Sequence, residues 1–228
     1  MYKHIIQLRA FTLTLLITCL LLPTTLLSQQ SELIDKVRAN DVEAVKALVA
    51  AGAELNEREE FYAMTPLILA CNSNYTEMAK VLIDGGADIH LQADNGATAL
   101  IMAAMNSLEL TELLLSKGAD IHAKSNNGTG AFSNCTMGII SERIGYELAE
   151  LLLAKGAEID ELNTTDFYSG YTPLFWAVYA NNEKLVKFLI EHGANVNTTA
   201  KDEKTPLSLA TESGYESIAN LLKAKGAK

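Results

Sequence analysis

The sequence predicts an all-α solenoid of about six helix-turn-helix units, joined by connections that resemble β-hairpin fingers. One observation behind this fold class is a Gly-Ala dipeptide that recurs after apolar segments, at Gly52, Gly86, Gly118, Gly156, Gly193 and Gly226. The successive spacings are 34, 32, 38, 37 and 33 residues, which is a period of about 33 with two insertions. A second observation is a threonine that opens short apolar segments, at Thr65, Thr98, Thr172 and Thr205.

The stretch 171–197, YTPLFWAVYANNEKLVKFLIEHGANVN, shows one unit in full. Thr172 followed by Pro173 is typical of a helix start, and we expect the threonine hydroxyl to accept a hydrogen bond from a backbone N–H two or three residues on. This helix should end near Asn181, which tolerates left-handed backbone. A second helix is predicted from Glu183, with Gly193 just after its end. Helices this short are unstable alone, so the units must bury their apolar faces against one another.

The segments TPLILA, TPLFWAV and TPLSLA and the period of about 33 residues resemble the ankyrin repeat, whose signature is T-P-L-H-x-A. The resemblance covers nearly all of the chain after its first 30 residues. The first unit has no TPL segment and has a charged first helix, so it should be an N-terminal cap, and the sixth should be the C-terminal cap. Units one to six are expected over residues 31–57, 58–90, 91–122, 123–160, 161–197 and 198–228.

Units three and four depart from the regular pattern. Unit three is one residue short near Asn106, which predicts a tighter turn between its helices. Unit four has six extra residues between Thr129 and Leu153. Its glycines, Gly130 and Gly138 among them, should discourage a regular first helix, so we expect a longer inter-helix loop near residues 141–145. The insertion is either functional or merely tolerated, since surface loop extensions cost little.

The N-terminus predicts a secretory signal peptide over residues 1–28, followed by the repeat domain over residues 29–228. Lys3 and Arg9 precede the 12-residue apolar segment FTLTLLITCLLL, and Ser28 is a plausible cleavage position. An uncleaved signal anchor is one alternative, although threonines and Pro23 make a poor membrane span. A lipoprotein attached through Cys19 is a weaker alternative.

Composition argues against nucleic acid as a partner. The chain has 18 Lys plus Arg and 28 Asp plus Glu, and without Lys3 and Arg9 the balance is 16 against 28, or −12. Phosphate binding needs a basic patch, which the sequence lacks. An acidic surface would favour a basic partner if charge contributes to steering, while a simple solvated surface is the alternative.

The sequence contains no recognisable catalytic or metal site, so we expect a non-catalytic protein without a cofactor or a bound metal. Cys71 and Cys135 lie two units apart, about 16–20 Å, whereas a disulfide needs Cα atoms within about 7 Å. Both are therefore predicted to be free thiols. His90 and His122 hold the same place in successive units, and imidazoles about 10 Å apart are too distant to share a metal ion.

The ankyrin resemblance implies a protein-binding scaffold whose contacts come from the concave face formed by fingertips and inner helices. Family positions carried onto this chain are Met64, Asn72, Ser73, Met105, Asn106, Tyr171, Tyr179, Lys204 and Glu212. Aromatic residues on two connections, Phe61 with Tyr62 and Phe167 with Tyr168, add candidate contacts because aromatic rings bring large area at low entropy cost. Alternatively, the aromatic residues of the second connection fold back on Trp176 and Tyr179.

Together these features predict an exported, monomeric scaffold that captures one protein partner and has no membrane contact after signal cleavage. The bacterial periplasm is the expected location. The alternative is a secreted effector that acts on a protein of a host or a competitor.

Overall fold

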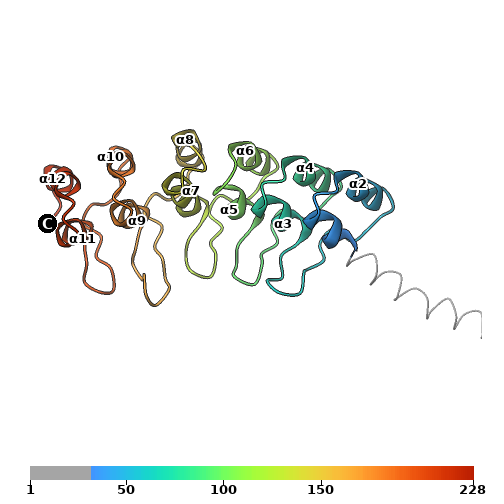
Figure 1. The fold of residues 1–228 in the computed structure, drawn as a ribbon, viewed down its shortest axis with the longest axis horizontal. Coiled ribbons are helices and arrows are strands. Elements are labelled where there is room, and N and C mark those ends of the chain that lie inside the picture. Colours follow the sequence, from blue (N-terminus) through green and yellow to red (C-terminus); the bar gives the residue numbers. More distant parts are fainter. Residues whose placement is uncertain (1–31) are drawn as a thin grey trace, which may run out of the picture.

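The structure, a computed structural model, describes residues 32–228 (Figure 1). The predicted signal peptide, with Cys19 and both alternatives for this segment, lies outside the described residues. Over those residues the chain is helical, with one isolated bridge between Gln92 and Thr98, which confirms the predicted all-α solenoid. The helices stand in two rows, and extended fingers project from one row on a single side of the molecule (Figure 1).

Each unit contributes one inner helix, next to the fingers, and one outer helix. The inner helices are residues 32–38, α3 (Pro66–Asn72), α5 (Ala99–Ala103), α7 (Ala131–Ile140), α9 (Pro173–Tyr179) and α11 (Pro206–Glu212). The outer helices are α2 (Val42–Ala50), α4 (Thr76–Asp84), α6 (Leu108–Ser116), α8 (Tyr146–Ala154), α10 (Glu183–Glu191) and α12 (Glu216–Ala224).

Successive inner helices approach one another closely because each of the five from α3 to α11 carries a small residue at the same position. These residues are fully buried and are Ala70, Ala103, Cys135, Ala177 and Ala210. Cys135 therefore holds a position that is alanine elsewhere, and Cys71 lies beside the alanine of unit two. Both cysteines are free, as predicted, and burial raises the pKa of each thiol to about 12.

The outer helices bury apolar residues four positions apart, the spacing that places two side chains on one helix face. Leu110 and Leu114 of α6, and Leu185 and Leu189 of α10, are fully buried. Ion pairs also join neighbouring outer helices, such as Lys80 with Glu109 at 2.7 Å. That pair is exposed, so it contributes at most about 1 kcal/mol, and the outer row depends on apolar packing.

The first helix, residues 32–38, has the character predicted for an N-terminal cap. Leu33 and Val37 are buried, whereas Glu32, Asp35 and Arg38 are exposed. A charged outer side is what a terminal unit requires, because no further unit covers it.

The connections between units form five fingers: finger one (57–64), finger two (91–97), finger three (123–129), finger four (161–171) and finger five (198–204). A backbone hydrogen bond joins each finger to the next. The bonds run from Asp94 N to Tyr62 O (2.9 Å), Asn126 N to Asn95 O (2.8 Å), Thr164 N to Asn127 O (2.8 Å) and Lys201 N to Ser169 O (2.9 Å). The fingers are therefore held at a fixed spacing along one edge (Figure 1).

Unit three loses residues from its inner helix, and the predicted tighter turn is wrong. Helix α5 has five residues, against seven in α3, and residues 104–107 then join it to α6. No residue between these two helices has a positive φ, unlike Asn74 in unit two (φ 57°) and Asn181 in unit five (φ 51°). A left-handed residue reverses the chain in those units, whereas the connection in unit three begins with right-handed Ala104 and ends with extended Ser107.

Unit four absorbs its extra residues mainly in its inner helix, so the predicted disruption by glycine is wrong. Helix α7 has ten residues, and the loop after it, residues 141–145, is longer as expected. A Cβ at Gly138 would lie 2.5 Å from the Met105 carbonyl oxygen and 2.8 Å from Ile144 Cδ1. Gly138 therefore permits a close approach of α7 to unit three, which offsets its low helix propensity.

Thr172 holds the N-cap position of α9, but the predicted hydroxyl cap is wrong. Its side chain makes no capping hydrogen bond, and its buried Oγ1 has no partner among the described residues. The Tyr171 ring instead packs on Trp176, with ring centroids 5.5 Å apart. This contact, between the residue before the cap and the fourth helical residue, is a hydrophobic staple that fixes how the chain enters the helix.

Glu57, at the start of finger one, is a carboxylate in an unfavourable environment. Burial raises its pKa to about 7, repulsion from Glu54 and Asp35 adds to the effect, and the backbone N–H of Ile34 opposes it. Its Oε1 is buried without a hydrogen-bond partner among residues 32–228. The charged form of Glu57 therefore destabilises the first unit.

We predict that Leu189→Ala lowers the free energy of unfolding by about 2–5 kcal/mol, because it leaves a cavity at a fully buried position of α10. Urea denaturation measures this change. Leu108→Ala is the control, since Leu108 is 37% exposed at the start of α6 and should cost less than about 1 kcal/mol. Equal losses in the two variants would show that the assigned core face of α10 is wrong.

We predict that Glu57→Gln stabilises the protein above neutral pH and has little effect near pH 5. The folded-state pKa, about 7, exceeds the ordinary value of 4.5, so the folded state holds the proton more strongly. Stability from this group is therefore lost as pH rises from about 4.5 through 7, and glutamine removes that loss. The measurement is the difference in melting temperature between variant and wild type at about pH 5 and pH 8. The same difference at both pH values would contradict the assignment.

Candidate interaction site

Finger four carries the most exposed large apolar side chain of the described residues. Phe167 is 89% exposed at its tip. The base of the finger is closed by hydrogen bonds from Asn163 N to Tyr171 O (2.9 Å) and from Gly170 N to Asn163 O (2.7 Å). The buried Asn163 Oδ1 also accepts from the N–H and the hydroxyl of Thr165, at 2.8 and 2.6 Å. The finger therefore presents Phe167 on a hydrogen-bonded turn.

An aromatic cluster lies beneath this fingertip. It consists of Tyr168, Tyr171, Phe175, Trp176 and Tyr179. Trp176 is its centre, with centroid distances of 4.9 Å to Tyr168, 5.5 Å to Tyr171 and 6.1 Å to Tyr179. Tyr171 also stacks on Phe175 at 4.6 Å and is only 7% exposed.

The sequence left two readings of these aromatic residues open, and each reading describes part of the structure. Tyr168 and Tyr171 fold back on Trp176. Phe167 lies outside the cluster, and Tyr179, although packed on Trp176, is 58% exposed. The surface open to a partner is therefore made by Phe167, Tyr179 and the outer part of Tyr168.

Finger one presents a second pair of aromatic residues, with Phe61 74% and Tyr62 65% exposed. The carboxylate of Glu59 is buried beneath them and accepts from Phe61 N at 3.1 Å, Tyr62 N at 2.6 Å and Arg38 Nη2 at 2.9 Å. Burial alone would raise the pKa of Glu59, but the backbone N–H groups of Phe61, Tyr62 and Met64 and the Arg38 guanidinium hold it below its ordinary value. The charged carboxylate therefore fixes the turn.

A polar pocket of about 300 Å³ lies between fingers two, three and four, against α5 and α7. Four asparagines and three hydroxyl residues supply its polar lining, which consists of Asn95, Ser125, Asn126, Asn127, Thr129, Asn134 and Thr165. In finger three, Asn127 Oδ1 accepts from the N–H of Thr129 at 3.2 Å and from its hydroxyl at 2.6 Å, and also from Ser125 Oγ. Amides in this pocket could hydrogen-bond to a partner's backbone.

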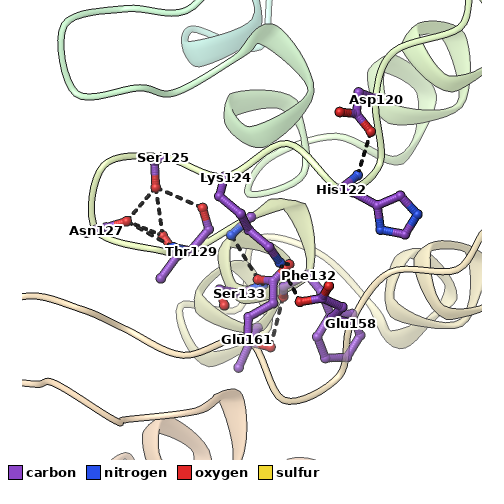
Figure 2. Close-up of polar contacts among 12 residues, drawn as sticks. Asp120, His122, Lys124, Ser125, Asn127, Thr129, Phe132, Ser133, Glu158 and Glu161 are labelled. Carbon is purple, nitrogen blue, oxygen red and sulfur yellow. Dashed lines mark hydrogen bonds and ion pairs between the residues drawn. The ribbon is translucent and has the colours of Figure 1, made fainter.

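A buried carboxylate from finger four caps the inner helix of unit four (Figure 2). Helix α7 begins after Gly130, which has no side chain to accept the N–H groups of the first turn. Glu161 Oε2 accepts from Gly130 N at 2.9 Å and from Ser133 N at 2.8 Å. In unit two the Thr65 hydroxyl accepts from Ile68 N, the third residue of α3, as Glu161 accepts from Ser133 N, the third residue of α7.

Lys124 neutralises this carboxylate. Its Nζ lies 2.7 Å from Glu161 Oε1 and 3.2 Å from Glu158 Oε2 (Figure 2). The Glu161 side chain is 0% exposed. Finger three, helix α7 and finger four are therefore joined by charge-assisted hydrogen bonds that converge on the buried Glu161, and such bonds are stronger than neutral ones.

The remaining predicted positions are dispersed along the concave side. Asn72 and Ser73 are exposed at the end of α3, while Met64 and Met105 are partly buried. Asn106 is engaged within the molecule, since its Oδ1 accepts from Arg143 Nη1 at 2.9 Å and its Nδ2 donates to Asn72 O at 3.4 Å.

Two more of the predicted positions, Lys204 and Glu212, form an ion pair at 2.9 Å in unit six. The structure thus gathers the aromatic candidates at fingers one and four. It does not join the others into one contiguous site.

The sequence interpretation did not assign a role to Glu161, Lys124 or Asn163, and it named Trp176 only as a packing partner for the aromatic residues of finger four. One signal was available, because Glu161 follows its Gly-Ala glycine by five residues, as Glu57 does, whereas the other units have Leu91, Ala123 and Thr198 there. A carboxylate at that position, in the finger that follows a unit whose inner helix begins after glycine, indicates that the carboxylate replaces the missing N-cap side chain.

The described residues contain no group of three or more His, Cys, Asp or Glu side chains that could hold a metal ion. His90 and His122 are exposed, and the backbone N–H of each donates to a carboxylate two residues earlier, Asp88 and Asp120 respectively. The two residues thus hold the same place in successive repeats, as expected. Within residues 32–228, every helix is too short or too polar to cross a membrane.

Comparison with known proteins places similarity along most of the chain. A family model described as ankyrin repeats (3 copies) matches residues 33–125 and 137–228. The chain is 31% identical over 197 residues to the ankyrin repeat protein YahD of Escherichia coli (strain K12), covering 82% of this chain and 92% of that protein. It is 28% identical over 188 residues to inversin of Mus musculus, covering 81% of this chain and 17% of inversin.

Among solved structures, the ankyrin repeat domain of Bcl-3, described as a member of the IkappaB protein family, is similar with a TM-score of 0.70 and 29% identity. The similarity covers 86% of each chain. The family model omits residues 126–136, which contain the start of α7 and its N-cap residue Gly130.

We predict that Glu161→Ala lowers the free energy of unfolding by about 1–3 kcal/mol, because it leaves two buried N–H groups without an acceptor. Gly130→Ser should also destabilise, since its Cβ would lie 2.5 Å from Glu161 Oε1. The double variant should regain about 1 kcal/mol relative to Glu161→Ala, because the serine hydroxyl can cap α7 once the carboxylate is absent. Urea denaturation of all four proteins measures the coupling, and purely additive losses would contradict the proposed cap.

Proposed function

This chain belongs to the ankyrin repeat family, and we propose that it is an exported, non-catalytic scaffold that captures a protein partner on its concave face. Ankyrin repeats generally mediate protein–protein interaction, and their fold is typically a non-catalytic scaffold. The family therefore supplies the class of function. The partner, the export and the contact residues are parts of the proposal.

The observation that carries the proposal is the exposure of Phe167 on a closed turn. An aromatic side chain that is 89% exposed contributes little to the fold, and Asn163 already orders the turn beneath it. A partner that covers Phe167 would gain apolar burial without the cost of ordering a flexible loop. Tyr179, 58% exposed on α9, extends the same surface toward the inner helices.

The polar pocket between fingers two and four supports the concave face as the docking side. It lies next to finger four, and Thr165 belongs to both. An apolar anchor beside a set of amides matches the usual anatomy of an interface, in which a few aromatic residues supply most of the affinity and polar groups fix the register.

The export part of the proposal depends on residues 1–28, with Lys3 and Arg9 before an apolar segment. The periplasm is the proposed location, and the protein is proposed to act there as a monomer. The alternative, a secreted effector that acts on a host or competitor protein, would place the native protein in the culture medium.

The test is to express the full chain in its native host with a C-terminal affinity tag, to cross-link, and to identify captured proteins after fractionation. A single partner in the envelope fraction supports the proposed scaffold. Recovery of the tagged protein from the medium, cross-linked to a protein of a host or a competitor, supports the effector alternative instead. Absence of any specific partner in both fractions contradicts the binding function.

We predict that Phe167→Ser lowers capture of the partner at least about tenfold, since an aromatic anchor contributes about 2 kcal/mol or more at an interface. Its melting temperature should match that of the wild type, because the side chain is 89% exposed. Tyr171→Ser is the contrasting variant and should lower the melting temperature, since this ring is buried in the aromatic cluster. Leu108→Ser, on the outer row, is the control for loss of an exposed apolar side chain. Undiminished capture by Phe167→Ser would exclude finger four as the contact.

A further inference from the structure

The same three-residue pattern occurs at the tips of two fingers. Finger one carries Glu60, Phe61 and Tyr62, and finger four carries Asp166, Phe167 and Tyr168. In both, an exposed carboxylate precedes two exposed aromatic side chains. Fingers two, three and five have no aromatic residue.

Both fingertips are held by a buried polar side chain that accepts hydrogen bonds from the turn. Glu59 accepts from the N–H groups of Phe61 and Tyr62, and Asn163 accepts from the N–H and hydroxyl of Thr165. Two unrelated sequences therefore produce the same result, which is an acidic and aromatic tip on an ordered turn.

The two tips lie three units apart on the same edge of the solenoid (Figure 1). Packed helices are about 8–10 Å apart, so three units separate the tips by about 24–30 Å. The backbone hydrogen bonds between neighbouring fingers fix this distance. A single protein surface of ordinary interface size spans it.

Carboxylates dominate the charge along this edge. The exposed acidic residues of the fingertips are Glu60, Asp94, Asp166, Asp202 and Glu203. Three cations belong to the same fingers. Lys201 Nζ lies 4.0 Å from Asp166, and Lys204 Nζ lies 2.9 Å from Glu212. Arg58 donates to the backbone oxygens of Ala63 and Gln92 at 3.2 and 2.6 Å. The edge therefore keeps a negative balance.

We infer that the fingertips of fingers one and four together dock a protein partner through a basic surface, with a lysine or arginine side chain of the partner at each tip. The inference rests on the proposed scaffold function and names the chemistry of its partner. The aliphatic stem of such a side chain packs on the phenylalanine ring. Its charged end meets the neighbouring carboxylate and the face of the tyrosine, which attracts cations.

An acidic partner or a nucleic acid would meet five carboxylates along this edge and would be repelled. A purely apolar partner would leave Glu60 beside the contact without compensation and would remove water from the Asp166–Lys201 ion pair, which costs free energy if these groups are covered. A basic surface is the occupant that satisfies both the rings and the charges.

The test uses the full-length protein and two fluorescent peptides of about 20 residues, one of alternating Lys and Ser and one of alternating Glu and Ser, each long enough to reach both tips. Fluorescence anisotropy measures binding at low and at physiological salt. We expect the lysine peptide to bind, more weakly as salt rises, and the glutamate peptide not to bind. No binding of the lysine peptide at low salt, or equal binding of both, overturns the inference.

Matched variants separate the fingertips from bulk charge. Glu60→Gln, Asp94→Asn and Asp166→Asn combined remove three charges at the fingers, while Glu112→Gln, Glu150→Gln and Glu191→Gln combined remove three on the outer helices. The finger variant should weaken lysine-peptide binding at least about tenfold, and the outer-helix variant less than about twofold, since only contact pairs resist screening. Equal weakening in the two variants would show attraction by net charge alone and overturn the inference.

Two single substitutions test whether both tips are used. Phe61→Ser and Phe167→Ser should each weaken binding, and their melting temperatures should match the wild type because both rings are exposed. Loss in only one of them overturns the two-tip arrangement.

The captured native partner then distinguishes this inference from the proposed function. A partner that binds the finger charge variant as well as the wild type leaves the scaffold function standing and removes the basic-surface chemistry. Absence of any partner removes the function itself.

Discussion

The close approach of successive inner helices is the constraint on which the rest of the structure depends. It requires a small side chain at one position per unit, which alanine supplies four times and Cys135 once. Helices of five to ten residues cannot persist alone in water, so each is stable only when its neighbour covers it. Finger spacing follows directly, because each finger leaves the end of an outer helix and enters the next inner helix.

A rigid spacing gives the fingertips a use that isolated loops would not have. Hydrogen bonds between neighbouring fingers carry the order of the helix rows outward to the edge, where Phe61 and Phe167 are exposed. The side-chain oxygens of Glu59 and Asn163, beneath these tips, accept hydrogen bonds from backbone N–H groups of the turn. The aromatic rings take no part in these bonds and stay exposed. The molecule thus separates the atoms that order the surface from those that face a partner.

Local sequence signals predicted the fold because they recur in several units, so a departure from the pattern in one unit did not change the prediction. Pro173 after Thr172, left-handed Asn181 and the glycine at Gly193 each have a local cause, and all three hold the expected backbone positions. What the sequence could not show depended on tertiary packing, both within a unit and between units. The staple of Tyr171 on Trp176 replaced a hydroxyl cap, and Gly138 served close packing where glycine usually weakens a helix. The candidate site was predictable in part for the same reason: the aromatic fingers were visible in the sequence, but whether a ring is exposed depends on tertiary packing.

The cap that Glu161 places on α7 makes the solenoid uneven along its length. Units two, three and six cap their own inner helices through Thr65, Thr98 and Thr205, so the first turn of each is complete without its successor. In unit four the acceptor for the first turn of α7 is Glu161, which lies in finger four, the connection that leads into unit five. In a linear array of repeats, the free energy of unfolding is a sum of the intrinsic stabilities of the units and of the interfaces between neighbours. Here the interface between units four and five is strengthened, and the intrinsic stability of unit four is lowered. Units four and five therefore behave as one cooperative block of the array, and finger four, which carries Phe167, loses the contacts of Glu161 whenever the start of α7 frays.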